Sequence, residues 1–144
     1  MKPKPDRPAS GEPSDGVTDS EYCVLGGGSV GAAVARRLGR AGHAVTLIES
    51  TDGSERGEPI DRRALDAAGI SASSTVVVAL PRDRQNLLAA QLVRARFGVD
   101  PVVVLANAPD RCELFASAGH EVVCATTVLS EALVERVQRD GDAT

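Results

Sequence analysis

The sequence contains very few aromatic residues and, apart from Lys2 and Lys4, no lysine. Aromatic residues make up 2% of the chain and hydrophobic residues 42%, so the core must consist of valine, leucine, isoleucine and alanine. Such a core favours α/β layers over a sandwich built on aromatic cross-strand pairs. Because the part expected to fold has no lysine, Schiff-base chemistry and a lysine-type phosphate loop are both excluded.

Charge, cysteine content and hydrophobic runs exclude further classes of protein. The formal net charge is −4, and no basic cluster indicates a nucleic-acid partner. Cys23, Cys112 and Cys124 are odd in number and far apart, with neither a disulfide framework nor zinc-ligand spacing, which favours a reducing cytoplasm. We expect no direct membrane insertion and no signal peptide, because the apolar runs are too short and the N-terminus is polar.

The rest of the chain alternates between strand and helix patterns. Residues 1–20 contain four prolines and almost no apolar side chains, so we expect a disordered tail. Residues 21–139 are expected to form one domain, and residues 140–144 a disordered C-terminus. Predicted strands cover 22–26, 43–49, 75–80, 101–106 and 121–125, and predicted helices cover 29–42, 60–70, 82–98, 109–119 and 127–138. This order predicts a Rossmann-like, doubly wound, mainly parallel sheet of five to six strands.

The tripeptide Ala-Gly-His occurs twice, each time where a predicted helix ends and a strand begins. Gly42 is expected in the position just after the first helix, where glycine is favoured. His43 and His120 are interpreted as polar residues near a helix C-terminus rather than as ligands or catalytic bases.

A glycine run lies between the first predicted strand and the first helix. Gly26, Gly28 and Gly31 match G-x-G-x-x-G in strand–turn–helix context, which is the context that gives this pattern a mechanism. Gly26 would allow the turn, Gly28 would let a pyrophosphate approach the backbone, and Gly31 would let the helix lie close to the sheet. The N–H groups of Ser29, Val30 and Gly31 would then face the anion. The alternative is that these glycines serve packing alone, in a fold that has lost its ligand.

An acidic residue, Glu49, ends the second predicted strand, near the expected interval of about 20 residues after the glycines. A carboxylate there accepts hydrogen bonds from both ribose hydroxyls and repels a 2′-phosphate. The sequence therefore favours NAD(H), or another unphosphorylated adenosine ribose, over NADP(H).

Several motifs together resemble a known family. The stretch VLGGGSVGAAVARRLGRAGHAVTLIE is similar to the start of the RCK N-terminal domain (regulator of conductance of K⁺), the nucleotide-binding module of Trk- and Ktr-type potassium-transport regulators. Residues 57–123 follow the family's Gly-Asp-Ala-Thr turn, Leu-x-x-Ala-Gly-Ile helix, Asp-x-x-Asn helix start and Gly-x-x-x-Val strand. The resemblance covers roughly residues 22–135 and is more specific than the glycines alone.

Three departures from the family pattern affect the expected site. Too few residues separate Glu49 from Gly57 for the usual helix and strand, so one outer βα unit is expected to be missing. In the turn near the adenine, Glu58 and Pro59 replace the family's aspartate and alanine. Leu105 replaces an arginine that often follows the penultimate strand. The chain also ends soon after the last helix, so we expect a single-domain member without the family's C-terminal domain.

The resemblance implies a regulatory domain without catalytic residues or metal, linked to potassium ion transport and located in the cytoplasm or on a membrane partner. Its cofactor would be NAD(H), with ADP or ATP as the alternative, and its partner a potassium transporter subunit. A small NAD-dependent oxidoreductase and a degenerate scaffold without ligand are the alternatives. The candidate cofactor-binding residues are Gly26, Gly28, Ser29, Val30, Gly31, Glu49, Ser50, Glu58, Pro59, Ala79 and Leu80.

The last predicted helix carries an apolar stripe formed by Val128, Leu129, Leu133 and Val137. This stripe must be covered either by the protein's own sheet or by another subunit. Two-fold pairing is the commonest way to bury such a surface, so we favour a homodimer.

Overall fold

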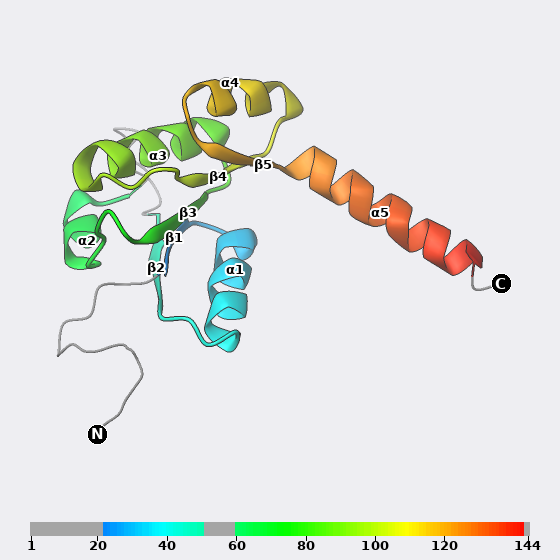
Figure 1. Cartoon of the computed structure of the whole chain (residues 1–144), viewed down its shortest axis with the longest axis horizontal. Helices are drawn as coiled ribbons and strands as arrows, with labels where there is room; N and C mark the ends of the chain where they lie inside the picture. The colour runs from blue at the N-terminus through cyan, green and yellow to red at the C-terminus, as the bar shows by residue number, and fades with distance from the viewer. Residues whose placement is uncertain (1–21, 51–59, 143–144) are drawn as a thin grey trace.

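The structure, a computed structural model, describes residues 22–50 and 60–142. It contains a five-stranded sheet whose strands are all parallel and lie in the order β2-β1-β3-β4-β5 (Figure 1). The strands are β1 Tyr22–Gly26, β2 Val45–Glu49, β3 Thr75–Ala79, β4 Val103–Ala106 and β5 Glu121–Cys124. The predicted doubly wound parallel sheet is confirmed, with the lower of the two predicted strand numbers.

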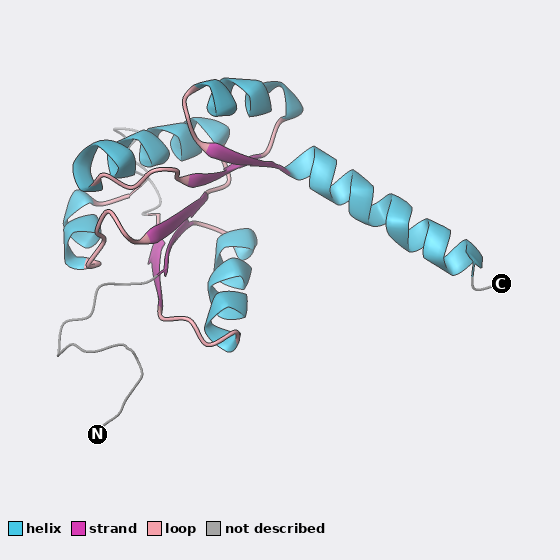
Figure 2. Ribbon diagram, in the orientation of Figure 1, coloured by secondary structure: helices cyan, strands magenta, loops and turns pink. Residues whose placement is uncertain are grey.

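The helices cover the two faces of the sheet unequally (Figure 2). On one face α1 packs over β1 and β2, while α2, α3 and α4 cover the other face. A fifth helix, α5, leaves the end of β5 and projects away from the sheet (Figure 1). The helices are α1 Ser29–Arg40, α2 Arg62–Ala67, α3 Asp83–Phe97, α4 Cys112–Ser117 and α5 Ala125–Asp142, with a 3₁₀ turn, η1, at Pro109–Arg111.

The core lies between the sheet and the layer formed by α2, α3 and α4. Alternate residues of the central strands point into it, as the β-branched composition predicts for a parallel sheet covered by helices. Leu65 anchors α2, Val93 anchors α3 and Phe115 anchors α4, each with at most 1% of its surface exposed. These three side chains hold the helices of that layer against the sheet.

The outer boundaries agree only in part with the sequence-based expectations. The strand β2 is the edge of the sheet in the described residues, on the side where an outer βα unit was expected to be missing. The helix α5 continues to Asp142, so residues 140–142, expected to be disordered, are helical. The predicted tail, the segment with Glu58 and Pro59, and residues 143–144 lie outside the described residues.

The cysteines differ from the expectation that no disulfide would form. Cys112 and Cys124 are joined by a disulfide, with Cα atoms 5.9 Å apart. The pairing arises because α4 turns the chain back so that its first residue lies beside the last residue of β5. Sequence spacing does not show this proximity. Cys23 is a buried free thiol in β1, as expected for a small apolar residue.

The apolar stripe of α5 does not pack on the described part of its own domain. Leu129, Leu133 and Val137 are 61%, 66% and 68% exposed. The expectation that the stripe could cover its own sheet is therefore wrong for the described residues. Separately, none of the described helices is both long enough and apolar enough to cross a bilayer.

Candidate functional site

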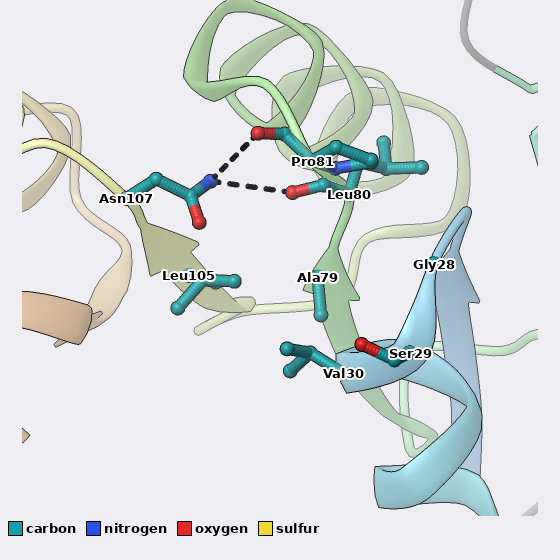
Figure 3. A pocket seen from close by; sticks show the side chains of 8 residues that line it. All are labelled: Gly28, Ser29, Val30, Ala79, Leu80, Pro81, Leu105 and Asn107. Atoms are coloured by element: carbon teal, nitrogen blue, oxygen red, sulfur yellow. Dashed lines mark hydrogen bonds between the residues drawn. The ribbon is translucent and has the colours of Figure 1, made fainter. Parts of the chain in front are cut away.

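The crevice at the carboxyl ends of β1 and β3 is the candidate site. The chain runs from β1 to β2 on one side, and β3 then returns to the other side of β1, so the strand order reverses between β1 and β3. Open α/β sheets bind ligands at this switch point. A cavity of about 240 Å³ lies there, and Figure 3 shows the side chains that line it. Its lining residues are Gly28, Ser29, Val30, Ala79, Leu80, Pro81, Leu105 and Asn107.

The N-terminus of α1 supplies hydrogen-bond donors to this cavity. Gly28 is the N-cap residue, and no side chain caps the helix. The first bond within the helix runs from the N–H of Ala32 to the carbonyl of Gly28, at 3.3 Å. The N–H groups of Ser29, Val30 and Gly31 therefore have no acceptor within the helix. Together with the helix dipole, they form a site suited to a phosphate or other anion.

The three glycines of the motif have different surroundings. A Cβ on Gly31 would lie 2.8 Å from the Cα of Gly26, so the helix and the strand touch through their backbones at this point. A Cβ on Gly28 would meet only the Cγ of Pro81, at 3.8 Å, on the open side of the turn. These surroundings agree with the packing role expected for Gly31 and with a Gly28 backbone left open to a ligand.

A fourth glycine, Gly27, was missed by the sequence analysis. A Cβ at this position would overlap the Oγ of Ser50. The N–H of Ser50 also donates to the carbonyl of Gly26 at 2.8 Å. This hydrogen bond holds the end of β2 against the glycine turn, and the missing side chain of Gly27 leaves room for Ser50. The signal was the consecutive glycines themselves, of which the motif uses only two.

Polar side chains fix the opposite wall of the cavity. The buried amide of Asn86 accepts a hydrogen bond from the N–H of Leu80 at 2.7 Å. Its nitrogen donates to the carbonyls of Leu80, at 3.0 Å, and Leu105, at 2.9 Å. One side chain thus ties the end of β3 to β4 and satisfies backbone groups that would otherwise be buried without partners.

A second pair of residues closes the edge of this wall. The carboxylate of Asp83 accepts hydrogen bonds from the backbone N–H of Asn107, at 2.6 Å, and of Ala108, at 2.9 Å. The side-chain nitrogen of Asn107 donates to the carbonyls of Leu80 and Pro81, as Figure 3 shows. Asn107 lines the cavity and was not among the predicted site residues. The Asp-x-x-Asn pattern of residues 83–86 is visible in the sequence, but its partners across β4 lie too far along the chain to be inferred from it.

The predicted residues on the β2 side lie beside the cavity rather than in it. Glu49 is paired in register with Gly26 and is exposed at the end of β2. Neither Glu49 nor Ser50 lines the cavity. Of the predicted site residues, the structure brings together Gly28, Ser29, Val30, Ala79 and Leu80 in the lining, with Gly26 and Gly31 beneath the turn.

The lining is suited to binding rather than to proton transfer. None of its residues carries a carboxylate, imidazole, amine or thiol. The two arginines that follow β3 do not line this cavity. Arg84 lines a different cavity, together with Arg111 and Phe115, and Arg82 lines neither of the two. Within the part of the chain that the structure describes, no three His, Cys, Asp or Glu side chains are grouped to hold a metal ion.

Comparison with known proteins gives related potassium-uptake proteins. The chain is 28% identical over 130 residues to the Trk system potassium uptake protein TrkA of Streptomyces coelicolor, covering 82% of this chain and 58% of that protein. It is 32% identical over 108 residues to a TrkA homolog of Methanothermobacter thermautotrophicus, covering 67% and 50%. The chain therefore spans somewhat more than half the length of the first relative and half that of the second.

Solved structures and a family model agree with this similarity. The NAD(P)-binding domain of an exopolyphosphatase-related protein from Archaeoglobus fulgidus has a TM-score of 0.65 at 24% identity, over 83% of this chain and 98% of that one. The GsuK channel bound to NAD has a TM-score of 0.68 at 20% identity, over 90% and 25%. At these identities the two structures establish the fold alone. The model of the TrkA-N domain matches residues 22–126. The resemblance drawn from the glycine turn and its neighbouring motifs is thus confirmed, and the chain belongs to the TrkA-N domain family.

Proposed function

We propose that this chain is a regulatory domain that binds NAD(H), or ADP or ATP as the alternative, at the glycine turn. The observation that carries the proposal is the uncapped N-terminus of α1, which opens into a cavity at the switch point of the sheet. Three N–H groups that have no acceptor within the helix, together with the helix dipole, suit a pyrophosphate. The NAD bound to a channel of the same fold supports this ligand class, and the names of the curated relatives support a role in potassium uptake.

The position of Glu49 supports NAD(H) over NADP(H). Its backbone is level with Gly26, so its carboxylate extends from the strand next to the glycine turn. An adenosine ribose beside that turn would place its hydroxyls near this carboxylate, whereas a 2′-phosphate would be repelled. The cavity of about 240 Å³ is smaller than pockets that enclose a drug-sized ligand. A dinucleotide would therefore extend beyond it, toward β2.

The experiment that tests the site is calorimetric titration with NADH, NAD⁺, ADP and ATP. Gly28→Val places a side chain where the pyrophosphate must lie, and we expect at least a tenfold loss of affinity, about 1.4 kcal/mol. Gly28 has φ −163° and ψ −161°, an extended conformation that valine also adopts, so the variant should fold. Gly39→Ala, on the exposed part of α1 with no atom near its added Cβ, is the matched control. Unchanged affinity in Gly28→Val would contradict the assignment, and no binding by the wild-type chain would favour a degenerate scaffold.

A second titration tests the ribose contact. Glu49→Gln keeps the size of the side chain and removes the charge, so we expect the preference for NADH over NADPH to fall toward equal affinity. Thr46→Ser, a conservative change earlier in the same strand, is the control for disturbance of β2. Equal affinity of the wild-type chain for NADH and NADPH would contradict the role of Glu49.

The regulatory part of the proposal concerns potassium ion transport in the cytoplasm. A bound nucleotide can shift a protein between two conformations only by its different affinity for each, and a partner such as a transporter subunit would respond to that shift. The lining without titratable groups disfavours the alternative, a small NAD-dependent oxidoreductase. A hydride-transfer assay with NADH separates the two functions, because turnover would require catalytic groups that the lining lacks.

The exposed stripe of α5 supports the homodimer. The helix α1 covers its face of the sheet only over the first strands. On the same face Val123 of β5 is 40% exposed, and Leu133 on α5 is 66% exposed. Two unpaired apolar surfaces on one chain can cover each other across a two-fold axis. Light scattering over a concentration series should give a dimer that Leu133→Glu dissociates. Leu88→Glu, at an exposed position of α3, is the matched control, and a monomer at every concentration would contradict the dimer.

A further inference from the structure

The disulfide joins the start of α4 to the end of β5. Cys112 is the first residue of α4 and Cys124 is the last residue of β5. Their Cα atoms, 5.9 Å apart, lie within the range in which a disulfide forms without backbone movement. In the described sheet β5 is an edge strand, hydrogen-bonded to β4 alone. The covalent bond is therefore a second tie for a strand that has one strand neighbour.

One end of the disulfide borders the wall of the candidate site. The Sγ of Cys112 lies 3.9 Å from the carbonyl oxygen of Ala108. The N–H of Ala108 donates to the carboxylate of Asp83, which also accepts from Asn107. Asn107 lines the cavity at the glycine turn. Only the hydrogen-bonded turn that contains Asn107 and Ala108 thus lies between Cys112 and the cavity.

The other end of the disulfide lies at the base of α5. Cys124 is followed directly by Ala125, the first residue of that helix. The helix projects from the domain (Figure 1), and its apolar side chains further along are exposed. Its position relative to the sheet therefore depends on this junction, and the disulfide links the junction to the wall of the site.

The chemistry of the three cysteines separates this pair from the third. Cys112 and Cys124 are both half-buried, so a small reagent can reach them. Cys23 has no exposed surface, and burial raises the pKa of its thiol to about 11. The thiolate is the reactive form, so exchange is restricted to the pair.

We propose that Cys112 and Cys124 form a reversible thiol–disulfide site that controls how firmly the base of α5 is held to the wall of the nucleotide cavity. The inference rests on the proposed function in one respect, the cytoplasmic location. Disulfides in the cytoplasm are usually transient and redox-sensing rather than structural. The oxidant is a low-molecular-weight disulfide, RSSR, and the reductant is the matching thiol, RSH.

The exchange proceeds in two balanced steps. The thiolate of one cysteine attacks RSSR, forming a mixed disulfide and releasing RS⁻. The thiolate of the second cysteine attacks the protein sulfur of that mixed disulfide, forming the Cys112–Cys124 bond and releasing a second RS⁻. Both thiol protons pass to the departing thiolates, so the pair is oxidised by two electrons while RSSR is reduced to two RSH. In the reverse direction, the thiol of Cys112 regains a hydrogen that it can donate to the carbonyl of Ala108.

The test equilibrates the whole chain in glutathione and glutathione disulfide mixtures, without nucleotide, and counts thiols by alkylation and mass. We expect two thiols to titrate together with one midpoint, while Cys23 stays unlabelled until the protein is unfolded. Amide hydrogen exchange of residues 121–130 should be at least tenfold faster in the reduced form, and a Cys112→Ser/Cys124→Ser variant should match it in either buffer. Cys23→Ala is the control and should titrate like the wild type.

The outcomes distinguish this inference from the nucleotide site. Thiols that stay reduced in the most oxidising mixture would overturn the exchange. Complete exchange with identical amide protection at the base of α5 would overturn the control of that junction. Neither result depends on NADH binding. A final titration with NADH should give different affinities in the two redox states, and equal affinities would overturn the link between the disulfide and the wall of the site.

Discussion

In two strand–helix–strand units of this protein, β1-α1-β2 and β4-α4-β5, the helix is followed by the same three residues, Ala-Gly-His. The turns have the same backbone, since Gly42 has φ +98° and Gly119 has φ +94°. The His43 N–H donates to the carbonyl of Leu38 at 3.1 Å, and the His120 N–H donates to that of Phe115 at 3.4 Å. The local sequence therefore determines the turn in both units, as expected for glycine after a helix.

The two histidine rings have different surroundings although their turns agree. The ring of His43 is half-buried, with its centroid 4.4 Å from that of Tyr22. His120 is only 6% exposed, and neither of its ring nitrogens has a hydrogen-bond partner among the described residues. The interpretation of His43 and His120 as polar turn residues therefore holds for their backbones. It does not hold for the ring of His120, whose burial is determined by tertiary packing.

The units differ more strongly at the other end of their helices. The first helix begins at an uncapped glycine and leaves its N–H groups open to the cavity. In the second unit, Pro109 begins a 3₁₀ turn, the carboxylate of Asp83 accepts the N–H groups just before it, and Cys112 is held by the disulfide. The same topology thus yields an open helix N-terminus, suited to an anion, in one unit and an anchored turn in the other.

The largest expected effect tests the close contact in the first unit. In Gly31→Val the added Cβ would lie 2.8 Å from the Cα of Gly26, and neither backbone can move without shifting the helix from the sheet. We expect a loss of more than about 3 kcal/mol in the free energy of unfolding, measured in urea. Gly28→Val should lose much less than this. Equal losses of unfolding free energy in both variants would show that Gly31 and Gly28 do not have separate roles, one in packing and one in leaving space for a ligand.

Reduction of the second unit's disulfide should have a slightly smaller effect. The bond closes a loop with a sequence separation of 12, and such a loop contributes about 3 kcal/mol by restricting the unfolded chain. Urea unfolding with and without a thiol reductant measures the difference. The Cys112→Ser/Cys124→Ser variant should show no response to the reductant. If the unfolding free energy of the wild-type chain is also the same with and without the reductant, closing this loop adds nothing to stability.

Acid should destabilise the protein through His120. Burial lowers the pKa of this imidazole, the Arg94 cation lowers it further, and the Asp100 carboxylate raises it in part. A depressed pKa means that the unfolded chain binds a proton more readily, so stability is present above the ordinary histidine pKa of about 6.5 and falls as pH drops below it. Each unit of depression corresponds to about 1.4 kcal/mol.

The measurement is the free energy of unfolding from pH 7.5 down to 5. His120→Leu should show a weaker loss over this range than the wild type. The matched change in the other turn, His43→Leu, controls for removing an imidazole from an Ala-Gly-His turn. If His120→Leu and the wild type lose stability in parallel, the buried ring is not the source of the pH dependence.

The sequence was sufficient for features that depend on neighbours along the chain. Alternating apolar runs and helical periodicity predicted the five strands and five helices of the described residues. The G-x-G-x-x-G spacing predicted the lining residues Gly28, Ser29 and Val30. Features that depend on distant contacts were missed, including the Cys112–Cys124 bond and the amide of Asn107 across the cavity. An apolar stripe such as that of α5 shows that a helix needs cover but not which surface supplies it.

The smallest expected effects separate two glycines at the end of α1. Gly39 lies within the helix, where a Cβ would meet no atom within 4 Å, so Gly39→Ala should stabilise the fold by about 0.5 kcal/mol. Gly42 also has free space, but its φ of +98° is strained for any residue with a side chain, so Gly42→Ala should destabilise by about 1 kcal/mol. Thermal unfolding of both variants measures the difference. Because neither change meets a steric contact, opposite signs must come from backbone conformation, and equal signs would mean that the turn after α1 does not require its glycine.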